Sequence, residues 1–205
     1  MKNKYYSLDR ILSQAPDARY YMMIGQRSNG KTYACLKHCL EEYFEKGSQF
    51  AIIRRWREDF KGKRGQSMFA GLVENGVIED LSEGMFTGVE YYRNAWYFAN
   101  YDEDGKAKKA PDPFAYAFAL TEMEHDKSTS YPNIRNVFFD EFLTKGYYLP
   151  DEFIVFCNVL STIIRDRDDV KVFMCANTVS KYNPYAEDMG LHKFNEMQPG
   201  DLDIY

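Results

Sequence analysis

Short apolar runs alternate with stretches of helical spacing along this chain. The runs that predict strands cover residues 20–24, 49–54, 114–120, 136–142 and 170–176. Apolar residues spaced three and four apart predict helices over residues 33–45, 66–77 and 150–164, with one or two further helical turns over residues 7–12. Strands that alternate with helices in this way build α/β domains with a mainly parallel sheet flanked by helices, and we expect that class here.

The apolar pattern changes between residues 88 and 120. Residues 89–92 and 95–99 predict two strands about a tight turn, and a second turn follows at residues 102–106. We interpret this segment as a β-hairpin insertion whose last strand, residues 114–120, joins the main sheet. A further turn is expected at residues 182–185, which read Tyr-Asn-Pro-Tyr.

A glycine-rich motif directly follows the first strand and precedes the first long helix. Its residues, Gly25, Gln26, Arg27, Ser28, Asn29, Gly30, Lys31 and Thr32, satisfy the phosphate-loop pattern G-x-x-x-x-G-K-[ST]. A loop between a strand and a helix N-terminus directs backbone N–H groups at one point, where the helix dipole favours negative charge. We therefore expect ATP to bind here, with Lys31 on the β- and γ-phosphates and the Thr32 hydroxyl on Mg²⁺. The opposing interpretation is a glycine-rich turn that binds no phosphate.

Two acids lie at the end of the apolar run at residues 136–142. We expect Asp140 to help hold Mg²⁺ and Glu141 to activate the attacking water. This motif is weak alone because strand ends often carry exposed acids, and the upstream phosphate loop is what makes it specific. Asn177 follows the next apolar run, where it could contact the γ-phosphate or the water as a sensor. The alternative for Asn177 is a turn that terminates the strand.

Length and composition fit one intracellular domain. With 205 residues, 45% of them hydrophobic, the chain can bury one normal core. No apolar run approaches the roughly 20 residues that cross a bilayer, and the N-terminus lacks an apolar signal segment, so we expect no membrane partner. The cysteines, Cys35, Cys39, Cys157 and Cys175, lack C-x-x-C spacing, and reduced, mostly buried thiols are expected.

A basic segment follows the second strand. Residues 54–64 contain six basic and two acidic side chains, although the whole chain carries a net charge of −5. A basic loop on an acidic body is compatible with contact to a phosphate backbone at one place. The charge pattern alone fits an exposed, solvated loop equally well.

Six segments give the chain a resemblance to a known family. They read GQRSNGKTYA, FAIIRRWRED, DKSTSYPN, VFFDEF, IIRDRDDVKV and ANTVSKYNPY, in this order and over nearly the whole chain. On these segments the sequence resembles the DNA-packaging (encapsidation) ATPases of small short-tailed phages of the Picovirinae type. The phosphate loop and the acidic pair occur in many ATP-binding proteins. Three other motifs are specific to this family: Tyr-Pro-Asn before the acidic strand, Asp-Glu-Phe at its end, and Asn-x-Val-Ser followed by Asn-Pro-Tyr.

The resemblance implies a P-loop NTPase fold of the additional-strand, catalytic-glutamate (ASCE) type. It also implies a homomeric ring, taken as a pentamer, that docks on the portal of an empty prohead in the host cytoplasm. ATP hydrolysis by this ring would drive double-stranded DNA through its channel. It leaves open whether a structural RNA joins the motor. Family members usually continue into a C-terminal domain resembling an inactive nuclease. Residues 1–205 end before one could fit, so we expect a single ATPase domain.

The resemblance further implies roles for individual basic residues. By motif, Arg165 is the finger that reaches a neighbour's ATP, Lys127 is a second trans-acting charge, and Arg27 is the phosphate-loop arginine typical of viral packaging motors. The residues that fall where such motors line the DNA channel are Arg57, Lys61, Lys63 and Arg64. At a helix end near a catalytic edge, Arg165 could stabilise γ-phosphoryl charge across an interface. Its alternative is a local ion pair with the aspartates that follow it.

Two other functions remain open on the sequence alone. A small-molecule kinase could use the same loop, but it would want an arginine-rich lid and an acceptor pocket, and neither is evident. A nucleotide-gated assembly module could bind ATP without turnover, but Glu141 argues against it because binding alone needs no water-activating carboxylate. The leading hypothesis is an ATP-driven DNA translocase with in-line attack of water on the γ-phosphate.

Overall fold

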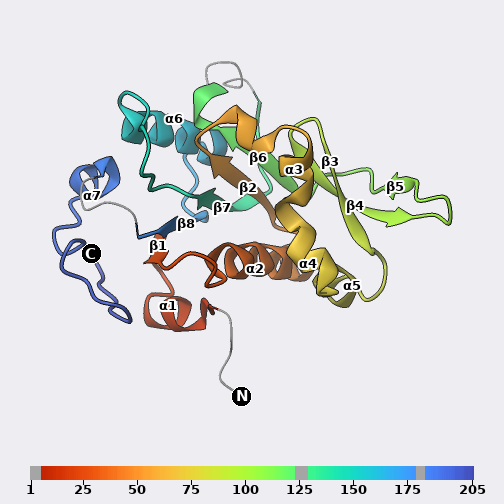
Figure 1. Cartoon of the computed structure of the whole chain (residues 1–205), viewed down its shortest axis with the longest axis horizontal. Helices are drawn as coiled ribbons and strands as arrows, with labels where there is room; N and C mark the ends of the chain where they lie inside the picture. The colour runs from red at the N-terminus through yellow and green to blue at the C-terminus, as the bar shows by residue number, and fades with distance from the viewer. Residues whose placement is uncertain (1–5, 123–128, 179–182) are drawn as a thin grey trace.

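One mixed sheet forms the centre of the computed structural model, which describes residues 6–122, 129–178 and 183–205 (Figure 1). Its strands follow the order β1-β8-β7-β2-β6-β4-β3, and β5 pairs with β4. The strands are β1 (Tyr20–Gly25), β2 (Gln49–Arg54), β3 (Gly88–Tyr92), β4 (Ala95–Tyr101), β5 (Ala107–Lys109), β6 (Ala115–Ala119), β7 (Ile134–Asp140) and β8 (Lys171–Asn177). The predicted strands are therefore confirmed, with ends that differ by a residue or two.

The sheet is parallel where the nucleotide motifs lie and antiparallel in the insertion. All pairs from β1 across to β6 run parallel, whereas β4 runs antiparallel to β6, β3 and β5. The turn between β3 and β4 consists of Arg93 and Asn94, whose φ values of 49° and 59° suit the tight two-residue hairpin turns that match strand twist. The predicted hairpin insertion that rejoins the main sheet through residues 114–120 is confirmed.

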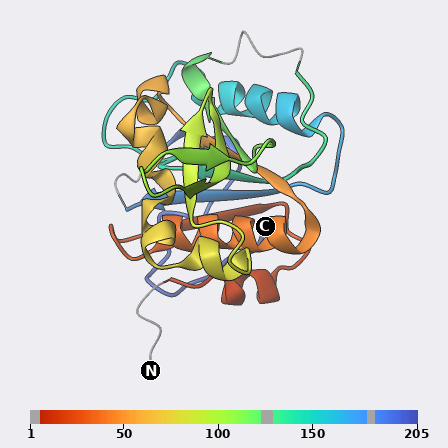
Figure 2. The same ribbon diagram turned by 90° about the vertical axis from the view of Figure 1, so that its right-hand side faces the viewer.

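Helices cover both faces of the sheet, as the end-on view in Figure 2 shows. The helices are α1 (Asp9–Gln14), α2 (Lys31–Lys46), α3 (Lys63–Gln66), α4 (Ala70–Glu74), α5 (Val77–Leu81), α6 (Glu152–Ile164) and α7 (Pro184–Asp188), with 3₁₀ turns η1 (Arg57–Phe60), η2 (Ser67–Phe69) and η3 (Leu120–Glu122). No helix in the described ranges is both long enough and apolar enough to span a bilayer.

Strand alternation divides the core into two clusters. On β7, Phe138 belongs to the cluster under α2, whereas Val137 and Phe139 belong to the cluster under α6. On β8, Phe173 packs on the α2 side and Met174 on the α6 side. Because both faces of these strands are buried, their sequences are almost continuously apolar, as expected for a parallel sheet between two helical layers.

Two sequence expectations are wrong in detail. The single helix expected over residues 66–77 is broken into η2, α4 and α5, because Gly76 takes a left-handed conformation (φ 71°) that ends one helix before the next begins. The turn expected at residues 182–185 is the start of α7. Asn183 caps it by accepting a hydrogen bond from Ala186 N at 2.8 Å, and Pro184 occupies the first turn, where it is well tolerated. Residue 182 lies outside the described ranges.

Candidate active site

The phosphate loop lies between the end of β1 and the start of α2. Ser28 and Gly30 have positive φ values of 61° and 90°, which curl the loop tightly. A Cβ on Gly25 would stand 3.1 Å from Asn29 Nδ2, closer than ordinary packing allows. Ala34 N donates to Gly30 O at 2.9 Å, so the helix begins at the loop itself. This strand–loop–helix geometry is the one that points backbone N–H groups at a phosphate.

Lys31 is buried in the centre of this loop. Its ammonium donates to Gln26 O at 2.8 Å, to Asn29 Oδ1 at 3.0 Å and to Gly25 O at 3.3 Å. Burial lowers the pKa of Lys31, and the negative charge of Asp140 acts in the opposite sense. The ammonium is thus held where a phosphate chain bound in the loop would meet it.

Asp140 and Glu141 lie beside the loop at the carboxyl end of β7. Thr32 Oγ1 donates to Asp140 Oδ1 at 2.9 Å, which brings the two expected magnesium ligands together. Mg²⁺ prefers such oxygen ligands, so the residues present fit a magnesium–nucleotide complex. Asp140 is buried, whereas 59% of the Glu141 side chain is exposed at the cavity, where water has access.

A cavity of about 310 Å³ joins these groups. Its lining is Ser28, Asn29, Gly30, Lys31, Thr32, Tyr33, Asn75, Asp140, Glu141, Cys175, Ala176 and Asn177. Asn177 ends β8 opposite Gly25 of β1, so its expected place at the site is confirmed, and its role as a sensor stays a prediction. Tyr33 and Asn75 were not predicted. Asn75 follows α4 in the segment after β2, and only the folded chain brings it here.

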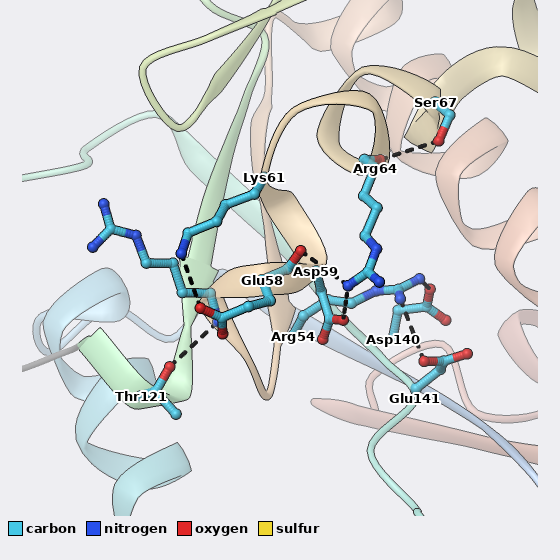
Figure 3. Close-up of polar contacts among 10 residues, drawn as sticks. Arg54, Glu58, Asp59, Lys61, Arg64, Ser67, Thr121, Asp140 and Glu141 are labelled. Atoms are coloured by element: carbon cyan, nitrogen blue, oxygen red, sulfur yellow. Dashed lines mark hydrogen bonds and ion pairs between the residues drawn. The ribbon is translucent and has the colours of Figure 1, made fainter.

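The basic segment after β2 is less exposed than its charge pattern indicates, because its first two arginines turn inward (Figure 3 shows the first of them). Arg54 forms an ion pair with Asp140 and donates from Nη1 to Glu141 Oε2 at 3.3 Å. β2 lies next to β7 in the sheet, and both strands end at the same edge, so the last residue of one meets the acids of the other. Interpreting Arg54 as part of a solvated loop is therefore wrong.

Arg55 reaches behind the acids and holds the backbone that follows them. It donates to Phe142 O at 2.8 Å, to Glu141 O at 3.3 Å, and from Nε and Nη2 to the Glu152 carboxylate at 2.7 Å each. Glu152 also accepts from Tyr185 OH at 2.7 Å. Burial raises the pKa of Tyr185, and the Glu152 charge adds to this effect. The network ties the residues after β7 to the starts of α6 and α7.

The four residues expected to contact DNA lie on the surface of this same segment. Arg57 forms an ion pair with Glu122, Lys61 pairs with Glu58 at 2.9 Å, and Arg64 approaches Asp59 at 3.9 Å. Lys63 is exposed at the start of α3. The segment starts from the edge of the sheet that carries Asp140 and Glu141, but acids balance much of its positive charge. Its contact with DNA stays a prediction.

The structure places some of the basic residues that are expected to act at the nucleotide, either within this chain or from a neighbouring subunit. Arg165 follows α6 and donates to Thr129 O at 2.9 Å, while Arg167 donates to Ile134 O, at the first residue of β7. This is the edge where β7 begins, opposite the edge that carries the phosphate loop. Arg165 therefore lies away from the phosphate loop of its own chain, and its role as the finger that reaches a neighbour's ATP stays a prediction. Arg27 is exposed on the loop, and Lys127 lies outside the described ranges.

The position of β8 defines the class of protein. β8 separates β1, which carries the loop, from β7, which carries the acids, and this inserted strand makes the fold a P-loop NTPase of the ASCE type. Within that class, the chain belongs to the family of podovirus DNA encapsidation proteins (Gp16), whose model matches residues 1–192.

Individual relatives agree with this family. The DNA packaging protein of Bacillus phage B103 is 28% identical over 188 residues, which cover 90% of this chain and 50% of that protein. The N-terminal domain of the DNA packaging ATPase from bacteriophage phi29 superposes with a TM-score of 0.69 at 25% identity, covering 91% of this chain and 86% of that one. The large terminase ATPase domain of Thermus phage P74-26 shares the fold, with a TM-score of 0.52 at 19% identity over 90% of this chain and 68% of that one. The chain spans about half the length of the DNA packaging proteins that it matches.

Proposed function

We propose that this chain is the ATP-hydrolysing motor domain of a ring that moves double-stranded viral DNA into a prohead. The observation that carries the proposal is the contact of the Thr32 hydroxyl with Asp140 at 2.9 Å, with Glu141 next in the chain and Lys31 in the loop beside them. A site that only bound nucleotide would not need a carboxylate placed beyond the metal ligands.

Each residue of the site has a distinct task in this proposal. Lys31 and the loop N–H groups bind the β- and γ-phosphates, and Thr32 and Asp140 hold Mg²⁺, which supplies charge neutralisation on the phosphates. Glu141 accepts the proton of the attacking water, and Asn177 contacts the water or the γ-phosphate. The trans-acting charges are Arg165 and Lys127 of a neighbouring subunit.

The names of similar proteins support a set of partners for the proposed motor. The relatives that match are DNA packaging proteins, and one similar chain belongs to the bacteriophage phi29 genome packaging motor assembly. We propose double-stranded DNA, the prohead portal and further copies of this chain as partners, in a ring taken as a pentamer that works at the portal in the host cytoplasm. The DNA-facing residues would be Arg57, Lys61, Lys63 and Arg64. A structural RNA is a further component to test.

Steady-state ATP hydrolysis across a series of protein concentrations tests the proposal. We expect the rate per chain to rise with concentration, because the trans-acting charges complete the site only when subunits meet. Double-stranded DNA should increase it further. Tight ATP binding without turnover at any concentration would favour the nucleotide-gated assembly module, and phosphate transfer to an added nucleoside would favour a kinase.

The assignment of Arg165 has its own test in mixed rings. Arg165→Ala chains and Glu141→Gln chains should each be inactive alone, and mixing them should restore part of the hydrolysis. Recovery is expected because some interfaces then combine an intact Glu141 with a neighbour's intact Arg165. Arg135→Ala is the matched control, since Arg135 pairs with Asp169 at 2.7 Å near the same edge and has no expected catalytic role. Absence of recovery at ring-forming concentrations would reject the assignment.

A further inference from the structure

Two buried cysteines touch behind the phosphate loop. Cys35 of α2 and Cys175 of β8 have their Sγ atoms 3.4 Å apart, and both residues are fully buried. The sulfur of Met23 lies 3.9 Å from Cys35 Sγ on the other side. Cys35 and Cys175 are free thiols in the structure. The mechanism above uses neither of them.

Both cysteines are part of the framework of the nucleotide site. Cys35 lies one helical turn after Lys31 on α2. Cys175 lies in the cavity wall, pairs in register with Asp140 of β7, and accepts a hydrogen bond from Phe142 N at 3.2 Å. A change in the distance between the two sulfurs therefore acts on the elements that carry the loop lysine and the acids.

We propose that Cys35 and Cys175 form a reversible disulfide under peroxide, and that this bond weakens nucleotide binding. Hydrogen peroxide oxidises the Cys175 sulfur to a sulfenic acid and is itself reduced to water. The Cys35 sulfur then attacks the sulfenic sulfur, forms the S–S bond and displaces a second water. Two thiols and one peroxide thus give one disulfide and two waters, and a dithiol reverses the reaction.

The cavity decides which sulfur reacts first. Cys175 is one of the residues that line the cavity and Cys35 is not, although both side chains are fully buried, so a peroxide molecule that penetrates the cavity wall meets Cys175 first. Burial raises the pKa of Cys35, and a protonated thiol reacts slowly with peroxide. When Cys35 attacks the neighbouring sulfenic sulfur, its proton leaves with the displaced hydroxide as water. Bound nucleotide would fill the same cavity and protect Cys175.

Geometry explains the expected effect on binding, which rests on the proposed function. An S–S bond is about 2.05 Å long, so the sulfurs must approach by more than an ångström from their present contact. In a close-packed core this displacement moves the first turns of α2 relative to β8. Lys31 and Thr32 begin α2 and Asp140 lies next to β8, so their alignment changes with it.

The other cysteines supply the controls. Cys157 is exposed on α6, on the opposite face of the sheet, so it can link two chains but cannot reach this pair. Cys39 is buried one turn beyond Cys35 on α2 and is the competing partner within the core. Peptide mapping of the oxidised chain separates these pairings.

The experiment treats the Cys157→Ser chain with hydrogen peroxide, with and without saturating ATP and Mg²⁺. We expect a linked peptide that joins Cys35 to Cys175, slower linkage with nucleotide present, and about tenfold weaker binding of a fluorescent ATP analogue, a change readily measured. Dithiothreitol should restore binding. In the same background, Cys35→Ala should form no such link and should keep its affinity for the analogue after peroxide.

Three results would overturn the inference. The first is absence of the Cys35–Cys175 peptide at a peroxide dose that oxidises the exposed Cys157 of the native chain. The second is a linked chain that binds the analogue as well as the reduced chain does. The third is an equal loss of binding in peroxide-treated Cys35→Ala. Failure of the untreated, reduced chain to bind the analogue counts instead against the proposed function, and the peptide map then decides alone whether the disulfide forms.

Discussion

Replacing Glu141 by glutamine is expected to lower the rate of ATP hydrolysis by about 10²–10⁴, the usual contribution of a general base. Glutamine keeps the size and polarity of the side chain but cannot accept the proton of the attacking water. The expected metal ligands, Thr32 and Asp140, remain in contact at 2.9 Å, so the affinity for Mg–ATP should stay within a few-fold of the native value. Single-turnover hydrolysis and equilibrium binding of a fluorescent ATP analogue separate the two effects.

The matched control is Glu103→Gln, which changes the same functional group at an exposed position next to β4, in the turn before β5. This variant should hydrolyse ATP at the native rate. If Glu141→Gln kept more than a tenth of the native rate, or lost nucleotide binding together with turnover, Glu141 would not be the general base.

Replacing Glu152 by alanine is expected to cost about 3–5 kcal/mol of folding free energy, because it leaves a buried charge without its partner. Arg55 and Glu152 are 5% and 1% exposed, and two of their hydrogen bonds are 2.7 Å long. The substitution also removes the acceptor for Tyr185 OH and for Leu149 N. Urea unfolding followed by fluorescence measures the loss as a lower midpoint at an unchanged slope.

Glu187→Ala provides the comparison, since Glu187 lies close by on α7 but is exposed. It should change the free energy of unfolding by no more than about 0.5 kcal/mol. Replacing both members of the buried pair, as Arg55→Met with Glu152→Leu, should recover part of the loss because no unpaired charge then remains. Equal effects of Glu152→Ala and Glu187→Ala would show that the ion pair contributes nothing to stability.

Local sequence patterns predicted most of the fold and the centre of the site. The apolar runs around β1 and β7 end at the glycine-rich loop and at Asp140, and each motif needs only its own neighbouring residues to be recognised. The same holds for the tight turn at Arg93 and Asn94. In these cases the structure follows from backbone preferences that act over a few residues.

Contacts between distant segments were the part that sequence could not supply. Arg54 was counted among the exposed charges because its contact with Asp140 depends on the pairing of β2 with β7, which lie about 90 residues apart along the chain. The buried position of Arg55 was missed for the same reason, since its partner Glu152 lies on a helix much later in the chain. For α7 the signal was present, because an asparagine followed by proline is a common helix start.

The sheet order also bears on how the chain folds during synthesis. Within the described residues, β1 stands at one end of the sheet and its partner is β8, the last strand along the chain. Closing so long a loop is entropically costly, and pairing over such separations slows folding. A nascent chain therefore carries the phosphate-loop strand without its partner until residues 171–177 have left the ribosome. We expect ATP binding to be acquired only at that late stage, although the loop is made before the other described strands of the sheet.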